Sequence, residues 1–329
     1  MIQEKIRIGV LSTASIGQRF IIPSLLSLPE NFELVGIASR SLETVKEAAE
    51  RFNCKPFGSY NEILNEEYID AIYIPLPNSL HYEWVKLALE RGIHALVEKS
   101  LACTLNEVIE LNQIAQNNHL ALIENFQFRF HSQLRTIKEL VDSGKIGTLR
   151  YIRSSFEFPP FPDSTNIRYQ KGLGGGALLD AGAYPLKISQ MFLGRDISVK
   201  ASTMRYDSSH EVDIGGGAFL KQDHGDAFAE IAFGFDNYYQ CSLEIYGSIG
   251  KISTNRIFTS PPNINPLVIL EIQGEAVEKI EIKQDNHFIN MLSHFYQTIY
   301  DQELREKEYT ENINQSRLIK EFKDYIDEK

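Results

Sequence analysis

The sequence predicts an α/β protein in two domains: a parallel sheet flanked by helices, and then an α+β domain with a large, mostly antiparallel open sheet. Two observations support this. Up to about residue 125, short apolar runs alternate with amphipathic stretches, which is the pattern of βαβ units. Beyond Phe126, long alternating segments follow one another with few helices between them, which is typical of antiparallel strands. The expected domains are residues 1–125 and 126–329, with C-terminal helices that can pack back on the first.

The first domain is expected to hold five buried strands, because its apolar runs are short and bounded by turn residues. They are Ile6–Leu11, Phe32–Ser39, Ala71–Leu76, His94–Val97 and Leu120–Asn125. Helical periodicity lies between them, over Ile16–Leu28, Leu42–Phe52, His81–Arg91 and Leu105–Asn117. Pro23 is expected to kink the first of these helices, since proline has no N–H for the helical ladder. Gly92 is a suitable residue to end the third.

The second domain is expected to be rich in strands. Alternating segments cover Leu149–Phe158, Gly217–Leu220, Phe228–Phe235, Tyr239–Tyr246, Val268–Ile272 and Ala276–Lys283. Helices are expected over Gln133–Asp142, over Leu178–Leu193, and twice more from Phe288 onward. No low-complexity linker separates the two domains, so the boundary is a change of pattern.

The composition is that of a globular protein, with 43% apolar and 23% charged residues and a formal net charge of −11. An acidic surface disfavours general binding to nucleic acid. No apolar run approaches the roughly 20 residues that span a bilayer, so no membrane association is expected. The three cysteines are widely spaced, which argues against a cysteine-based zinc site and for reduced thiols. No metal is expected, and without a signal-peptide pattern a cytoplasmic location is expected.

The segment between the first strand and the first helix is a candidate phosphate loop. It runs from Gly9 to Gly17, where small residues let backbone N–H groups at a helix N-terminus approach a pyrophosphate. Ser12, Ala14 and Gly17 stand at the three positions of the G-x-G-x-x-G pattern, so only the last is glycine. A tight strand-to-helix turn without a ligand is the alternative. As a binding loop it predicts a Rossmann domain whose cofactor contacts include Ser12, Thr13, Ala14, Ser15, Ile16 and Gly17.

The end of the second strand bears on the choice of cofactor. Arg40 follows Gly17 by 23 residues, near the place where NAD-binding proteins carry a carboxylate for the ribose 2′-hydroxyl. No carboxylate occurs here before Glu43, whereas a guanidinium beside the hydroxyl of Ser39 suits a 2′-phosphate. The alternative is a solvated arginine at the start of the next helix. The position relative to the loop favours the first interpretation and predicts NADP(H).

Two further segments carry candidate chemistry. Glu98, Lys99 and Ser100 follow a strand whose carboxyl end borders the ligand crevice of a parallel sheet, where a lysine can donate to a carbonyl. Taken alone, this lysine is better explained as an ordinary surface residue at a strand end. A glycine run then precedes a helix that carries Asp180 and Tyr184 four residues apart, hence on one face. An acid and a phenol placed there indicate a site, with a buried structural tyrosine as the alternative.

Together with Pro75–His81, Glu124-Asn125-Phe126 and Gly174–Pro185, these residues resemble the Gfo/Idh/MocA oxidoreductases, named for glucose–fructose oxidoreductase and inositol dehydrogenase. The resemblance covers nearly the whole chain. It implies a nicotinamide cofactor, a sugar or polyol substrate, and homodimers or homotetramers that pack through the sheet of the second domain. It also implies that Lys99 is catalytic. The family's proline is Ser100 here, which is expected to loosen the turn but to leave Lys99 in place.

Tyr184 occupies the position of a histidine in many family members. This resembles the branch that reduces keto sugars attached to nucleotides, and also the dihydrodiol and xylose dehydrogenases. The segments that begin at Phe158, Ile167 and Phe258 look closest to the nucleotide-sugar 3-ketoreductases of deoxysugar biosynthesis. That resemblance places a further set of residues beside the cofactor or substrate: Leu76, His81, Glu98, Arg168 and Asp180 near the cofactor, and Tyr239 and Thr259 near the sugar nucleotide.

The expected reaction is NADPH-dependent reduction of a keto group, with C3 favoured, on a nucleotide-linked deoxysugar. Lys99 would stabilise the oxyanion that develops at the carbonyl, and either Tyr184 or Lys99 would supply the proton. An NADP-dependent dehydrogenase of a free sugar or cyclic diol is the enzyme alternative. Arg256, close to Thr259 in sequence, suits a diphosphate and so favours the nucleotide-linked substrate. A non-catalytic NADP-sensing regulator is the alternative of another class.

Overall fold

The parallel sheet predicted for the first part of the chain forms in the computed structural model, which describes residues 4–327. Its six strands lie in the order β3-β2-β1-β4-β5-β6, and every neighbouring pair is parallel. They are β1 (Ile6–Leu11), β2 (Phe32–Ala38), β3 (Lys55–Phe57), β4 (Ala71–Ile74), β5 (His94–Glu98) and β6 (Leu122–Asn125). The order reverses beside β1, and strand ends at such a switch point form the ligand crevice of a Rossmann sheet. The predicted Rossmann domain is thus confirmed.

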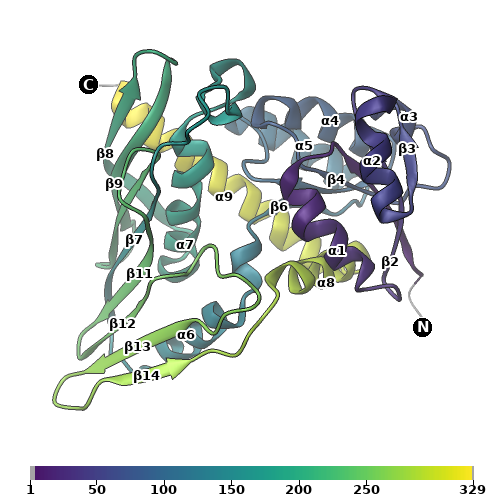
Figure 1. Cartoon of the computed structure of the whole chain (residues 1–329). Coiled ribbons are helices and arrows are strands. Elements are labelled where there is room, and N and C mark those ends of the chain that lie inside the picture. The colour runs from purple at the N-terminus through teal and green to yellow at the C-terminus, as the bar shows by residue number, and fades with distance from the viewer. Residues whose placement is uncertain (1–3, 328–329) are drawn as a thin grey trace. The chain divides into compact units, whose positions relative to one another are not determined.

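Helices cover this sheet on both faces (Figure 1). An aliphatic core joins one face to α3 (Tyr60–Leu64), α4 (Asn78–Glu90) and α5 (Leu105–Asn117). On the other, Phe20 stacks at 4.9 Å on Phe288 of α8 (His287–Tyr300), beside α1 (Ile22–Leu26). α2 (Leu42–Phe52) follows β2, and α9 (Gln302–Asp327) ends the described chain.

Side-chain caps explain why two helices begin where the sequence predicted. The Ser41 hydroxyl accepts the Thr44 N–H at the start of α2, and Thr104 forms a reciprocal capping box with Glu107 at the start of α5. The helix predicted over Ile16–Leu28 is instead divided, with a π-helical turn η1 (Gly17–Ile21) directly before α1. The division falls just before Pro23, where the missing N–H interrupts the regular ladder.

The described chain separates into two compact units. The first comprises the residues up to Asn125 together with Phe288–Ile313, and the second comprises Phe126–His287 and the residues from Asn314 onward. Within the first unit, Asn312 of α9 donates to the Leu122 carbonyl at 3.1 Å, so the start of α9 packs against β6.

The second unit is built on an eight-stranded sheet in the order β14-β13-β12-β11-β7-β10-β9-β8. Every neighbouring pair is antiparallel except β7 with β10, so the predicted, mostly antiparallel open sheet is confirmed. The strands are β7 (Leu149–Glu157), β8 (Ile197–Asp207), β9 (Val212–Gln222), β10 (Phe228–Gly234), β11 (Gln240–Gly247), β12 (Gly250–Thr254), β13 (Leu267–Ile272) and β14 (Glu278–Glu281). β3, β8 and β12 were not predicted.

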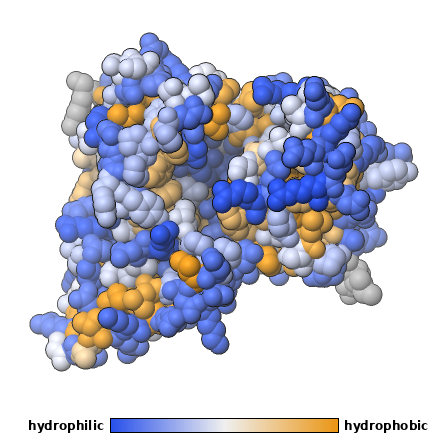
Figure 2. All heavy atoms as spheres, in the orientation of Figure 1, coloured by the Kyte–Doolittle hydropathy of each residue, from blue (hydrophilic) through white to orange (hydrophobic). Residues whose placement is uncertain are grey.

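Helical segments pack on one face of this sheet (Figure 1). One of them is a π-helical turn, η5 (Leu178–Gly182), that leads into α7 (Ala183–Leu193). Another is the later part of α9, where Phe322 packs against Phe233 of β10. The remaining helical segments of this unit are η2 (Gln127–Phe130), α6 (Ser132–Asp142), η3 (Ile167–Tyr169) and η4 (Lys171–Leu173). Figure 2 shows apolar surface over the β13–β14 hairpin, where Leu267 and Val277 are exposed. Within residues 4–327, no helix is both long and apolar enough to cross a membrane.

Candidate active site

The candidate phosphate loop is hydrogen-bonded to the chain at the ends of the two strands beside β1. The Ser12 N–H donates to the Ala38 carbonyl at the end of β2 (2.8 Å), and the Ser12 hydroxyl donates to the Pro75 carbonyl just after β4 (3.3 Å). Ser12 has a φ of 94°, a backbone region that glycine adopts readily and other residues seldom do. The backbone at Ser12 therefore has the conformation that glycine has in such loops, and this conformation fits the close approach of a pyrophosphate.

The end of β2 leaves a cation available for a phosphate. The Ser39 hydroxyl lies 2.7 Å from that of Thr44, and Arg40 beside it is exposed. Within the described residues, no ion pair occupies the Arg40 guanidinium. Burial raises the pKa of Tyr60, and the positive charge of Arg40 opposes that rise. The residues present therefore fit a ribose 2′-phosphate.

The turn that carries Lys99 is held by buried hydrogen bonds. His81, predicted to lie beside the cofactor, is instead fully buried in α4, with one ring nitrogen 2.7 Å from the Ser100 carbonyl and the other 2.7 Å from that of Leu76. Burial lowers the pKa of His81 to about 4, although the two carbonyls oppose this. With both nitrogens engaged and no exposed surface, His81 supports the turn and does not reach a ligand. That prediction is corrected accordingly.

The expected loosening of this turn by Ser100 is also wrong. Ser100 is buried, and its N–H donates to the Asn78 side-chain oxygen at 3.2 Å, a bond that proline could not make. The Lys99–Ser100 peptide bond is cis. Just before it, one carboxylate oxygen of Glu98 accepts from the Tyr73 hydroxyl (2.7 Å) and from the Asn125 amide (2.8 Å). Glu98 is therefore held in one orientation at the carboxyl end of β5.

In the second unit, the glycine run folds the chain back on itself. A Cβ at Gly175 would lie 2.6 Å from the Arg168 carbonyl oxygen, and the Gly176 N–H donates to that same oxygen at 2.9 Å. Gly176 has a φ of 116°, and a Cβ there would lie 2.1 Å from the Asp213 carboxylate. That carboxylate accepts the Leu178 N–H at 2.6 Å and so caps the following helix. Sequence reasoning missed Asp213, because no local pattern links it to a turn so distant in the chain.

The structure brings Arg168, Asp180 and Tyr184 together. The Arg168 Nε lies 2.6 Å from an Asp180 carboxylate oxygen, and both Asp180 and Tyr184 favour the charged form of Arg168 and so raise its pKa, against desolvation. Asp180 lies in the π-helical turn η5 and Tyr184 in the α-helix that follows it. Tyr184 is 6% exposed because aromatic rings surround it. Their centroids lie 5.0–5.7 Å from its own, and they belong to Phe126, Phe128, Phe156 and Phe258.

The predicted substrate residues also lie together. The Tyr239 hydroxyl is 3.4 Å from that of Thr259 and 3.5 Å from the Arg256 guanidinium, which also lies over the Tyr239 ring. Burial raises the pKa of Tyr239, and Arg256 opposes that rise. Thr259 follows Phe258 directly, so this cluster adjoins the aromatic surroundings of Tyr184. The result is a polar cluster that carries one exposed cation, Arg256, and lies beside the surroundings of the buried Tyr184 phenol.

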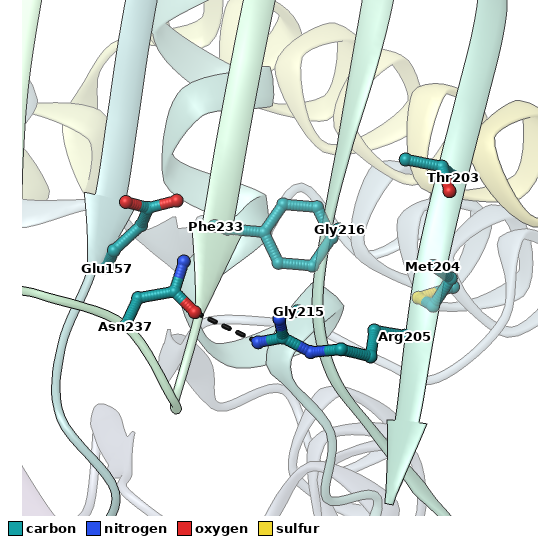
Figure 3. Close-up of a pocket in the computed structure, with 8 residues that line it drawn as sticks. All are labelled: Glu157, Thr203, Met204, Arg205, Gly215, Gly216, Phe233 and Asn237. Carbon is teal, nitrogen blue, oxygen red and sulfur yellow. Dashed lines mark hydrogen bonds between the residues drawn. The ribbon is translucent and has the colours of Figure 1, made fainter.

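A separate hollow of about 240 Å³ lies near the ends of β7, β8 and β10 and the start of β9 (Figure 3). Arg205 donates to the Asn237 side-chain oxygen at 3.0 Å across its rim, and Glu157 points into the same space. Burial raises the pKa of Glu157. No residue predicted for the site lines this hollow.

Comparisons with known proteins agree with this geometry. Residues 6–126 match the model of an oxidoreductase family with an NAD-binding Rossmann fold, and residues 134–253 match the GFO/IDH/MocA C-terminal domain. A dTDP-3,4-didehydro-2,6-dideoxy-alpha-D-glucose 3-reductase of Actinomadura kijaniata is 35% identical over 95% of this chain and 93% of its own. A crystal structure of a 3-ketoreductase from Actinomadura kijaniata, in complex with NADP and TDP-benzene, superposes with a TM-score of 0.93 at 34% identity and covers 98% of both chains.

The similarity extends to an enzyme that acts on a free sugar. An NADP⁺-dependent D-xylose 1-dehydrogenase of Haloferax volcanii is 31% identical over 80% of this chain and 79% of its own. The matched domains, the extent of the identity and the shared fold lead to one conclusion: this chain belongs to the Gfo/Idh/MocA family of oxidoreductases.

Proposed function

We propose that this protein is an NADPH-dependent ketoreductase that acts at C3 of a nucleotide-linked deoxysugar. The observation that carries the proposal is the cluster of Tyr239, Thr259 and Arg256 beside the surroundings of Tyr184, because two hydroxyls and an exposed guanidinium suit the diphosphate of a sugar nucleotide. A free sugar needs no such cation. The names of the 3-reductase and of the TDP-benzene complex lend further support.

Residues of both units have roles in this proposal. Bound NADPH would supply the hydride. The phosphate loop from Ser12 to Gly17 would hold its pyrophosphate, and Ser39 and Arg40 its 2′-phosphate. Lys99 would stabilise the negative charge that develops on the carbonyl oxygen, and Tyr184 or Lys99 would donate the proton.

Arg168 and Asp180 have orienting roles in the proposal. Their ion pair holds both side chains at the start of the helix that carries Tyr184. Asp180 would orient a hydroxyl of cofactor or substrate, with Arg168 holding its carboxylate in place. Leu76 and Glu98 line the carboxyl ends of the strands in the first unit, where Glu98 can accept from a ribose hydroxyl.

The decisive experiment measures NADPH oxidation with a dTDP-linked 3-keto-deoxysugar, and NADP⁺ reduction with D-xylose as the comparison. We expect turnover of the nucleotide-linked substrate only. Arg256→Gln should raise KM for it with little change in kcat, whereas Lys99→Met and Tyr184→Phe should lower kcat. Turnover of D-xylose alone would favour the free-sugar dehydrogenase, which the Haloferax relative makes the second candidate. Tight NADPH binding without turnover of either substrate would favour a regulator.

We also propose that two copies of the chain associate through the face of the eight-stranded sheet opposite α7. On this face Tyr151 is stacked between Tyr246 (4.3 Å) and Phe228 (5.0 Å), and all three rings are partly exposed. Ala232 and Gly217 are cross-strand neighbours on the same face, where small side chains permit close approach. Light scattering should find a dimer or tetramer, and Ala232→Arg should dissociate it. A wild type that is monomeric at high concentration would contradict this.

We expect the enzyme to act in the cytoplasm.

A further inference from the structure

The short segment of residues 256–259, which carries two of the proposed diphosphate contacts, is held at its start by a buried amide. The segment lies just after β12 and includes Arg256 and Thr259. The side-chain amide of Gln133, in α6, donates to the Arg256 carbonyl at 3.2 Å. The same side chain accepts the Thr254 hydroxyl at 2.9 Å, and Gln133 is 0% exposed. A residue of a distant helix therefore fixes the point at which the segment leaves the sheet.

The other end of the segment is held by Cys241 of β11. The Cys241 carbonyl accepts the Ile257 N–H at 3.2 Å, and its sulfur accepts the Phe258 N–H at 3.4 Å. The same sulfur lies 3.5 Å from the Thr259 hydroxyl oxygen. Cys241 and Phe258 are both buried, so these contacts lie away from solvent. Three consecutive residues of the segment are thus joined to a single strand residue.

We propose that Gln133 and Cys241 are positioning residues that keep Arg256 and Thr259 in place for the diphosphate of the substrate. The inference rests on the proposed function, in which the latter two side chains bind that group. Gln133 and Cys241 are themselves buried, so each acts through the segment and makes no contact with the ligand.

The exposure of the binding side chains gives this support its value. Arg256 is exposed, and ordering a long, flexible side chain when a ligand binds costs free energy. The Tyr239 hydroxyl lies 3.5 Å from the Arg256 guanidinium and 3.4 Å from the Thr259 hydroxyl, so the three groups already lie together. A backbone that is hydrogen-bonded at both ends of the segment preserves this arrangement and so lowers the cost of binding.

The test measures the mobility of the segment and its affinity for a diphosphate separately. Hydrogen exchange of the Ile257 and Phe258 amides, followed by mass spectrometry of peptides that contain them, reports on mobility without any ligand. Calorimetry then measures the binding of dTDP, a nucleoside diphosphate without the sugar, to the protein loaded with NADPH. The affinity for NADPH serves as an internal reference.

Two variants remove the two supports independently. Gln133→Leu replaces the amide by an apolar group of similar size, and Cys241→Ala removes the sulfur. Cys241→Ser is the conservative variant, because it keeps a hydrogen-bonding atom on the same carbon. Gln315→Leu is the matched control for the amide. Gln315 is also 0% exposed, donates to the Ala183 carbonyl at 2.8 Å and accepts from the Gln190 amide at 2.7 Å.

We expect Gln133→Leu and Cys241→Ala to speed hydrogen exchange of the segment and to weaken dTDP binding roughly 3- to 10-fold, as the loss of one hydrogen bond would. Affinity for NADPH should stay the same, because the residues proposed to bind its phosphates belong to the first unit. Cys241→Ser should recover part of the dTDP affinity. Gln315→Leu should change neither the exchange nor the dTDP affinity.

Unchanged dTDP affinity in the folded Gln133→Leu and Cys241→Ala proteins would overturn the proposal. An equal loss in Gln315→Leu, or an equal loss of NADPH affinity, would also overturn it, since either result indicates general damage. The two supports come from different elements, so one variant suffices if the other does not fold. A wild type that binds no dTDP would refute the proposed function, and faster exchange in the variants would then still support the two residues as the hold on the segment.

Discussion

Gly176→Ala should destabilise the protein, because two separate features of the turn require glycine at this position. The φ of 116° lies in a region that residues with a side chain rarely adopt. An added Cβ would also lie 2.1 Å from the nearer Asp213 carboxylate oxygen, far inside contact distance. Because Asp213 accepts the Leu178 N–H at 2.6 Å, it cannot move away without giving up its role as a helix cap.

The size of the effect follows from these two contributions. Holding alanine in such a backbone conformation costs about 1–3 kcal/mol. Displacing the capping carboxylate costs about 0.5–2 kcal/mol more. We therefore expect the free energy of unfolding to fall by roughly 1.5–5 kcal/mol. Turnover should fall as well, because the Asp180 N–H bonds to the Gly176 carbonyl at 3.3 Å and its helix carries the proposed acid.

Urea unfolding followed by far-ultraviolet circular dichroism measures the loss. Gly172→Ala is the matched control, since nothing lies within 4 Å of a Cβ built there, and it should leave stability unchanged or slightly raised. In an Asp213→Ala background, Gly176→Ala should be less damaging than in the wild type, because the clash and the cap are already gone. If Gly176→Ala proved as stable as Gly172→Ala, the reasoning would be refuted.

Three further predictions concern the cofactor, acid stability and the substrate. Arg40→Ala should weaken NADPH binding about 10- to 100-fold in a fluorescence titration and leave NADH binding unchanged; equal losses for both would contradict a 2′-phosphate contact. Burial lowers the pKa of His94 to about 4, and its Nδ1 accepts the Ala121 N–H. The unfolded chain therefore binds more protons between pH 6.5 and 4, so stability should fall as the pH drops through this window, by at most about 1.4 kcal/mol per pH unit from this residue. His94→Gln should make that slope shallower, and an unaltered slope in urea unfolding would count against the assignment. Tyr239→Phe should raise KM for a nucleotide-linked substrate several-fold with little change in kcat, whereas a matching loss in kcat alone would place the hydroxyl in the chemistry.

Local patterns in the sequence were sufficient for most elements of the first unit. The predicted bounds of Ile6–Leu11, Leu42–Phe52 and Leu105–Asn117 agree with the structure. In the two helices the reason is local, since Ser41 and Thr104 cap them through residues three positions away. Such signals need no knowledge of the fold.

Strands whose side chains give no clear alternation could not be predicted in this way. β8 lies at the edge of its sheet, and much of its side-chain surface is at least partly exposed, so hydrophobic periodicity is weak along it. The parallel pairing of β7 with β10 also leaves no local trace, because it depends on which strand edges meet after the intervening chain has folded.

The features of the candidate site also fall into those that local sequence predicts and those that depend on tertiary contacts. The sequence by itself determined the family, the position of the candidate phosphate loop and the residue types available for the chemistry, because these depend on motifs of a few adjacent residues. Only the tertiary structure decided that His81 is a buried support, that Asp213 caps the glycine turn, and that Gln133 donates to the Arg256 carbonyl. These contacts join residues far apart in the chain, and burial, which sets the pKa and reach of each group, exists only once those surfaces have packed together.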